Sequence, residues 1–288
     1  MDAAFRFALC NELFQGVSLR QTCEAVRRLG YAGLEIAPFT LADDPVALPR
    51  SARHEIRAII AESGLSFAGL HWLLAAPAGM HVTTPDEALR RRSWNYLRHL
   101  VDLCADLAGN NAGHNGVMVF GSPKQRSTTG GIDREDAIRI FTAELARLAP
   151  HAEQHGVTIL VEALPADQSD VINSLAEAVH IVKQIGNPAV QTMFDVHNAV
   201  NEDLAHADLL ERYFPFIRHV HVNEVDGREP GSGSYDFAAL LTRLDKLKYS
   251  GWISLEVFDF SRDAGEVASR ALSHLKSSLP AATVSQTI

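Results

Sequence analysis

The chain has 288 residues, of which 47% are hydrophobic and 21% are charged, as in globular proteins with a sizeable core. Its formal net charge of −9 argues against a nucleic-acid partner, because a surface that neutralises phosphates needs clustered lysine and arginine. The three cysteines are widely spaced without a Cys-x-x-Cys pair, which favours buried thiols in a reducing compartment. No secretory leader is recognisable and no apolar run approaches about 18 residues, so we expect a cytoplasmic protein without a membrane partner.

Short β-rich runs alternate with longer segments of helical period, a pattern typical of a parallel sheet with crossover helices. The predicted strands are FRFALC at 5–10, GLEIA at 33–37, LSFAGLH at 65–71, GVMVFG at 116–121, VTILVEA at 157–163, VQTMFDV at 190–196, IRHVHVN at 217–223 and WISLEVF at 252–258. The predicted helices span 18–29, 51–63, 86–108, 133–154, 174–186, 203–213, 236–247 and 262–278.

Eight alternating pairs predict an α/β fold, a single (β/α)8 TIM barrel over residues 1–288, with 280–288 as a frayed tail. An open doubly wound sheet is the alternative fold. It is disfavoured because no Gly-x-Gly-x-x-Gly motif follows the first strand, where a dinucleotide-binding domain would place it.

One side chain able to bind a metal stands near the carboxyl end of each of the last four predicted strands: Glu162, Asp195, His221 and Glu256. Because strand side chains alternate between faces, these four meet at the barrel mouth if their faces point inward. Three carboxylates and one imidazole suit a hard divalent cation, with Mn²⁺ expected first and Mg²⁺ or Co²⁺ as alternatives. The competing interpretation is that such acidic residues are helix caps or surface ion pairs.

Two segments beside these strands carry candidate substrate-binding residues. His197 stays on the face of Asp195 if the strand continues, where it could touch a substrate hydroxyl or orient a metal ligand. Arg228, in the Gly-rich segment 223–237, could bind a hydroxyl or carbonyl oxygen, and Gly231 and Gly233 would let the backbone approach a ligand. Both segments could equally be plain surface loops.

Earlier strand ends add further candidates for the same mouth. Glu35 ends the second predicted strand, and His71 with Trp72 ends the third. The turn-rich stretch 109–116 precedes the fourth strand, and a long loop at 121–131 follows it. Within that loop, the run Lys124–Arg126 either binds a substrate phosphate or is merely solvated.

The sequence resembles the xylose isomerase-like barrels and, within them, the ketose 3-epimerases that act on D-tagatose or D-psicose. The resemblance extends over nearly the whole chain and rests on the order and spacing of YAGLEIAP, VFGSPKQRS, VEALP, DVINSLAEAV, MFDVHNA, HVHVNE, GREPGSG and SLEVF.

This resemblance implies a sugar epimerase or isomerase in which the four strand-end residues hold the metal and Glu162 and Glu256 also exchange the substrate proton. It implies that His197 and Arg228 bind substrate oxygens, and that the protein forms dimers or tetramers. The chain departs from the family where ketose 3-epimerases typically carry a substrate-binding glutamate, since this position holds Gln168. A neutral amide binds a hydroxyl less strongly than a carboxylate does, and it cannot act as a base.

Three other functions share parts of this pattern. A metal-dependent lyase or dehydratase of a keto-sugar or dehydroshikimate-like substrate would use the same enolate chemistry. A non-catalytic sugar-binding barrel would keep the metal without turnover. Hydrolysis of abasic DNA by an endonuclease IV-like barrel needs several metals and many more histidine ligands, and the acidic net charge argues against it.

Overall fold

The chain folds as a closed ring of parallel strands in this computed structural model, which describes residues 5–109 and 116–280. Neighbouring strands pair in chain order, and β8 closes the ring by pairing with β1. The strands are β1 (Arg6–Cys10), β2 (Gly33–Ile36), β3 (Ser66–Leu70), β4 (Val117–Phe120), β5 (Thr158–Val161), β6 (Val190–Asp195), β7 (Ile217–Val222) and β8 (Trp252–Leu255). The predicted TIM barrel is therefore confirmed, and the open doubly wound alternative was wrong.

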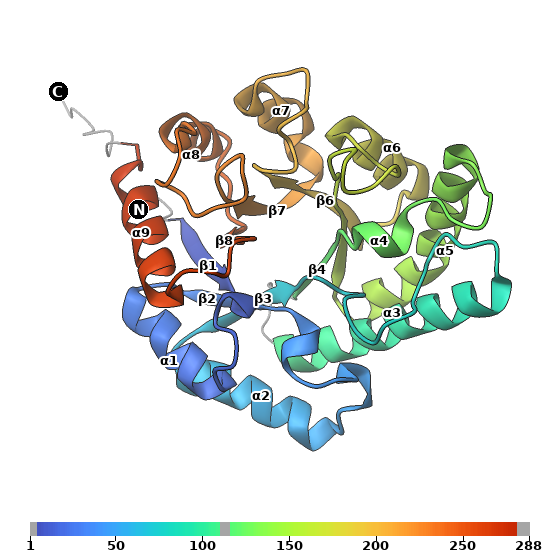
Figure 1. The fold of residues 1–288 in the computed structure, drawn as a ribbon, viewed down its shortest axis with the longest axis horizontal. Coiled ribbons are helices and arrows are strands. Elements are labelled where there is room, and N and C mark those ends of the chain that lie inside the picture. The colour runs from blue at the N-terminus through green and yellow to red at the C-terminus, as the bar shows by residue number, and fades with distance from the viewer. Residues whose placement is uncertain (1–4, 110–115, 281–288) are drawn as a thin grey trace.

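Helices form an outer ring around these strands (Figure 1). They are α1 (Leu19–Leu29), α2 (Arg50–Glu62), α3 (Glu87–Ala108), α4 (Pro123–Arg126), α5 (Arg134–Gln154), α6 (Leu175–Ile185), α7 (His206–Tyr213), α8 (Phe237–Lys246) and α9 (Ala264–Ser277). Short 3-10 helices are η1 (Asn11–Leu13), η2 (Pro38–Thr40), η3 (Pro45–Ala47) and η4 (Phe214–Phe216). Within the described part of the chain, no helix is long and apolar enough to cross a membrane.

Helix α6 illustrates how local sequence sets the helix boundaries. The Ser174 hydroxyl accepts a hydrogen bond from the backbone N–H of Glu177, and the Glu177 carboxylate accepts one from the backbone N–H of Asn173. These bonds satisfy donors that a helix start leaves unpaired. The helix ends at Gly186, whose φ of 65° lies in the left-handed region that favours glycine.

Two local predictions differ from the structure. The segment after β4 is not a continuous loop, because Pro123 to Arg126 form the short helix α4. The strand carrying Asp195 ends at that residue, and 196–200 form a turn, so His197 does not continue the strand as expected. The predicted frayed tail, apart from Pro280, and positions 110–115 of the turn-rich stretch lie outside the described residues.

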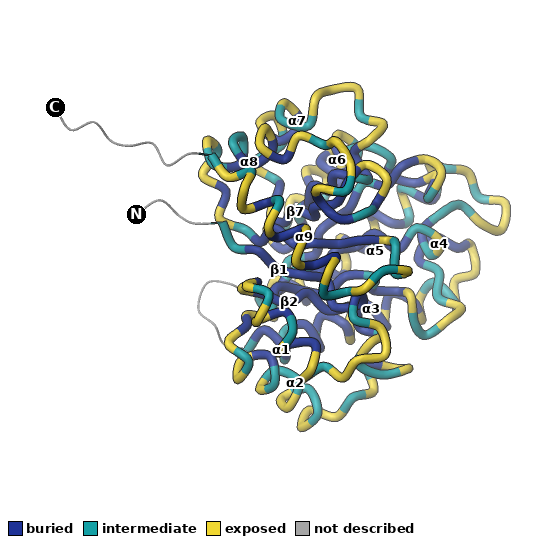
Figure 2. The backbone as a smooth tube through the Cα atoms, turned by 60° about the vertical axis from the view of Figure 1, so that its left-hand side comes forward, coloured by how far each residue is buried: buried dark blue, intermediate teal, exposed yellow. Residues whose placement is uncertain are grey.

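The buried residues gather in the strands and on the inward sides of the helices, as Figure 2 shows. Most of the apolar core lies between the barrel and its helices. Inside the barrel, Val119, Leu160 and Met193 form a separate apolar cluster below the mouth. At the amino-terminal end of the strands, the Arg6 guanidinium lies 4.4 Å from the ring centre of Trp252.

Candidate metal centre and substrate cavity

The structure brings together the strand-end residues that the sequence singled out. Glu162 directly follows β5, Asp195 ends β6, His221 lies in β7 and Glu256 directly follows β8. One potential ligand atom from each residue lies within 4.8 Å of the others, and all four side chains are buried. Four consecutive strands thus present a compact set of metal-binding groups at the barrel mouth.

The buried carboxylates in this cluster repel one another. Burial, reinforced by the carboxylates of Glu256 and Asp195, raises the pKa of Glu162 to about 8. Burial and Glu256 raise the pKa of Asp195 to about 6. Burial also acts to raise the pKa of Glu256, but contact with His221 outweighs it and leaves this pKa lowered. Carboxylates that repel one another in a buried site fit a divalent cation, and their oxygens with one imidazole suit Mn²⁺, Mg²⁺ or Co²⁺.

Hydrogen bonds from Asn198 and Trp72 help to hold the carboxylates in position. The Asn198 side chain donates a hydrogen bond to Glu162 Oε1 over 2.9 Å, and its backbone N–H donates to Asp195 Oδ1. The Trp72 indole N–H donates to Glu256 Oε1 over 2.8 Å. A side chain at Gly121 would collide with the Glu162 carboxylate, because an added Cβ would lie 2.1 Å from Oε2. The carboxylates are therefore fixed by residues outside the predicted ligand set.

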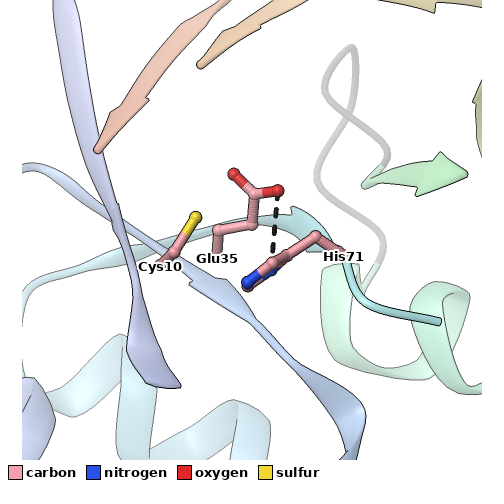
Figure 3. Close-up of side chains that lie close together, drawn as sticks. All are labelled: Cys10, Glu35 and His71. Carbon is pink, nitrogen blue, oxygen red and sulfur yellow. Dashed lines mark ion pairs between the residues drawn. The ribbon is translucent and has the colours of Figure 1, made fainter. Parts of the chain in front are cut away.

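A buried polar layer lies beneath His221. Glu35 is fully buried and accepts hydrogen bonds from His219 Nε2 at 2.8 Å and His221 Nε2 at 3.1 Å. Figure 3 shows Glu35 facing His71, whose Nδ1 lies 3.6 Å from a Glu35 oxygen, with the thiol of Cys10 alongside. Glu35 was predicted to line the mouth, but it lies below His221, where its carboxylate fixes the orientation of the imidazole.

Glu162 and Glu256 line a cavity of about 540 Å³, a size usual for small-ligand pockets. The predicted residues His71, Gln168 and His197 line it together with Trp72 and Phe258. His197 reaches the cavity from its turn rather than from a strand. Its Nδ1 donates to the backbone oxygen of Val225, and its Nε2 lies 3.2 Å from the Gln168 amide.

Arg228 does not reach this cavity. Its guanidinium pairs with Asp226 at 2.8 Å, and Asp226, rather than Arg228, is the residue of this loop that lines the cavity. The glycines of the same segment approach protein groups: an added Cβ at Gly231 would meet His274, and one at Gly233 would meet Glu224. These close approaches shape the loop itself.

The three residues from Lys124 to Arg126 do not all face the cavity. Lys124 and Gln125 line the cavity. Arg126 is fully buried, and its guanidinium donates to the backbone oxygens of Phe120 and Ile172. Arg126 therefore ties β4 to the segment after β5 and does not face a solvated loop.

Several residues that contact the four strand-end residues or the cavity wall were not predicted from the sequence. Asn198 follows the expected aspartate by three positions, and Asn223 follows His221 by two on the same strand face. Asn223 accepts a bond from the backbone N–H of His197 and donates one to Asp195 Oδ2 over 3.2 Å. Glu12, in η1 after β1, bonds His71 Nε2 over 2.8 Å. The asparagines could have been found from their spacing, but Glu12 carried no comparable signal.

Comparison with known proteins identifies the family. The family model described as "Xylose isomerase-like TIM barrel" matches residues 23–278. This match covers most of the chain, which therefore belongs to the xylose isomerase-like TIM barrel family. The predicted family resemblance is confirmed.

Several relatives that match this chain are epimerases. L-ribulose 3-epimerase of Mesorhizobium japonicum is 26% identical over 200 residues, which cover 69% of this chain and 64% of the relative. D-psicose 3-epimerase of Agrobacterium fabrum is 28% identical over 38% of each chain. The matched segments thus span less than two thirds of these two relatives. The 3-dehydro-D-guloside 4-epimerase of Escherichia coli is 24% identical over 85% of this chain and 89% of the relative. All three relatives are named as sugar epimerases.

Solved structures agree on the fold. The D-psicose 3-epimerase of Clostridium cellulolyticum, determined with D-tagatose, has a TM-score of 0.82 at 18% identity and covers 96% of this chain and 100% of its own. The 3-keto-D-glucoside 4-epimerase of E. coli has a TM-score of 0.81 at 20% identity and covers 95% of this chain and 100% of its own. At such low identity these matches establish the barrel alone.

Proposed function

We propose that this chain is a divalent-metal-dependent epimerase that moves a proton at the carbon next to a carbonyl, at carbon 3 of a ketose or at an equivalent carbon of a keto-sugar. The observation that carries this proposal is the position of two buried carboxylates. Glu162 and Glu256 follow strands β5 and β8, bracket Asp195 and His221 along the ring, and both line the cavity. Two carboxylates placed in this way can reach both faces of one carbon atom.

The four strand-end residues would hold the cation, with Mn²⁺ as our first expectation and Mg²⁺ or Co²⁺ next. A bound divalent cation would act as a Lewis acid on the neighbouring carbonyl and hydroxyl oxygens of the sugar and so acidify the C–H bond between them. The crowding of three buried carboxylates supports a cation at this place, because like charges are costly to bury together.

The protein's own groups would then carry the proton. One of the two glutamates removes the proton from one face of the carbon, which leaves a planar enediolate in the substrate. The other glutamate returns a proton to the opposite face, and the configuration is inverted. Asn198 and Trp72 each hold one oxygen of these carboxylates, so both bases keep a fixed position relative to the cavity.

Substrate binding would fall to the polar residues of the cavity wall. His197, Gln168 and His71 line the cavity, and His197 and Gln168 bond each other, so a sugar hydroxyl can form hydrogen bonds with this wall. Arg228 would need to break its pair with Asp226 before it could contact a sugar. The relationship to ketose 3-epimerases and to a keto-glycoside 4-epimerase supports a free ketose or a keto-sugar as substrate.

The test is turnover of Mn²⁺-loaded protein on a panel of ketoses and keto-glycosides in deuterated water, followed by NMR. We expect deuterium at the inverted carbon together with the epimer, and loss of both after treatment with a chelator. Deuterium at carbon 1 would indicate an aldose–ketose isomerase instead. An unsaturated product absorbing in the ultraviolet would replace the proposal with a lyase or dehydratase.

A further inference from the structure

A second cluster of metal-binding side chains lies on the outside of the barrel, between helices α3 and α5. Asp102 of α3 faces His151 of α5 and His155, which directly follows the last residue of α5. One potential ligand atom from each of these three residues lies within 4.8 Å of the others. None of them lines the cavity above the strand-end residues.

The spacing of the two histidines suits joint binding of one ion. Residues four apart on a helix lie on the same face, and the two rings are 4.2 Å apart between centres. Asp102 Oδ1 lies 2.7 Å from His151 Nε2 and 3.7 Å from His155 Nε2. Ligands about 2.0–2.2 Å from a tetrahedral zinc ion lie roughly 3.3–3.5 Å from one another, between these two separations. Small side-chain rotations would therefore give three ligand positions.

The hydrogen bond of His155 leaves one ring nitrogen available, whereas His151 Nε2 is hydrogen-bonded to Asp102 Oδ1, so a bound ion would replace the proton of that pair. His155 Nδ1 donates to the backbone oxygen of His151 over 2.9 Å, which leaves Nε2 with the free electron pair that a metal needs. Asp102 pairs with three histidines, counting His99 at 3.5 Å, and in the described part of the chain it pairs with no lysine or arginine. About a third of the side-chain surface of Asp102 and of His155 is exposed, so an ion can enter from solvent.

We propose that Asp102, His151 and His155 form a surface site for a borderline divalent transition ion, Zn²⁺ above all, with solvent completing the coordination. Two imidazoles and one carboxylate are common zinc ligands, whereas the oxygen-rich set at the barrel mouth suits harder cations. The bound ion would link α3 to α5, and it would stabilise the folded chain because the unfolded chain lacks the preformed site. The site does not depend on the proposed epimerase activity.

The test is calorimetric titration of the full, Mn²⁺-loaded chain with Zn²⁺, comparing wild type with His155→Ala and with His180→Ala. His180 is an exposed histidine on α6 and serves as the matched control. We expect wild type and His180→Ala to bind one more Zn²⁺ than His155→Ala, or to bind it at least about tenfold more tightly. Exchange at the barrel mouth would affect all three proteins alike and cancels in the comparison.

A thermal melt of each protein with and without Zn²⁺ gives an independent readout. Zn²⁺ should raise the Tm of wild type and His180→Ala more than that of His155→Ala, and Asp102→Asn should behave like His155→Ala. Equal stoichiometry, affinity and Tm shift in all the variants would overturn the site and leave Asp102 and His151 as an ordinary hydrogen bond between helices.

Discussion

The two sides of the barrel interior support the candidate metal centre in different ways. On β5 and β6, the residues two positions before Glu162 and Asp195 are Leu160 and Met193, which belong to the apolar cluster inside the barrel. On β7 and β8, the residues two positions before His221 and Glu256 are His219 and Ser254, both buried and polar. Two of the four proposed ligands therefore lie above apolar residues, the apolar floor, and two lie above buried polar residues, which together with Glu35 form the polar floor.

This difference separates two physical tasks. Above the apolar floor, burial and the neighbouring carboxylates outweigh the opposing charge of His221, and the pKa values of Glu162 and Asp195 are raised. In the polar floor, Glu35 accepts a hydrogen bond from His221, and His221 in turn contacts Glu256. On the side of Glu162 and Asp195, burial disfavours the negative charges that a cation would neutralise. On the side of His221 and Glu256, hydrogen bonds fix the positions of the groups that would bind it.

The largest expected effect comes from neutralising either proposed base. Glu162→Gln and Glu256→Gln should each lower kcat by about 10²–10⁴-fold, the usual contribution of a positioned acid or base. The measurement is steady-state kinetics with the epimerised sugar, alongside metal analysis of each variant. Full turnover by Glu162→Gln with metal bound would exclude that residue as a base.

Removing an apolar side chain from the apolar floor should lower the stability of the fold and leave metal binding nearly unchanged. Leu160→Ala removes a fully buried side chain from the cluster with Val119 and Met193 and should lower the free energy of unfolding by about 2–5 kcal/mol. Chemical denaturation of the metal-free protein measures this loss. Mn²⁺ affinity at low denaturant should stay close to wild type, and a large drop in affinity would mean that the apolar floor also sets ligand geometry.

A substitution in the polar floor should instead reduce metal affinity. Glu35→Gln keeps the shape of the side chain but removes the charge that orients His221, so Mn²⁺ affinity should fall about 10–100-fold. Calorimetric titration of the metal-free protein measures this change. The Leu160→Ala protein is its control, and equal affinity in the two variants would remove the distinction between the floors.

The sequence predicted the eight strands, the helices apart from α4, and the meeting of the four strand-end residues, because those features depend on periodicity and on the topology of a barrel. It placed Glu35 at the mouth, since pattern alone cannot tell that His219 and His221 would cover a carboxylate from the opposite side of the ring. Arg228 looked free in the sequence because nothing there shows a turn that folds it back onto Asp226. Contacts of this kind depend on loop geometry.

The smallest expected effect concerns the cavity wall above both floors. Gln168 lies within reach of His197 and lines the cavity, so Gln168→Ala should remove one hydrogen bond to substrate and weaken the hold on His197. Removing one neutral hydrogen bond costs about 1 kcal/mol, or roughly a fivefold lower kcat/KM. Because the change lies outside both floors, Mn²⁺ affinity and the free energy of unfolding should stay near wild type. A rise in KM with kcat retained would show that Gln168 binds the ground state and transition state alike, whereas an equal fall in kcat would place it at the reacting carbon.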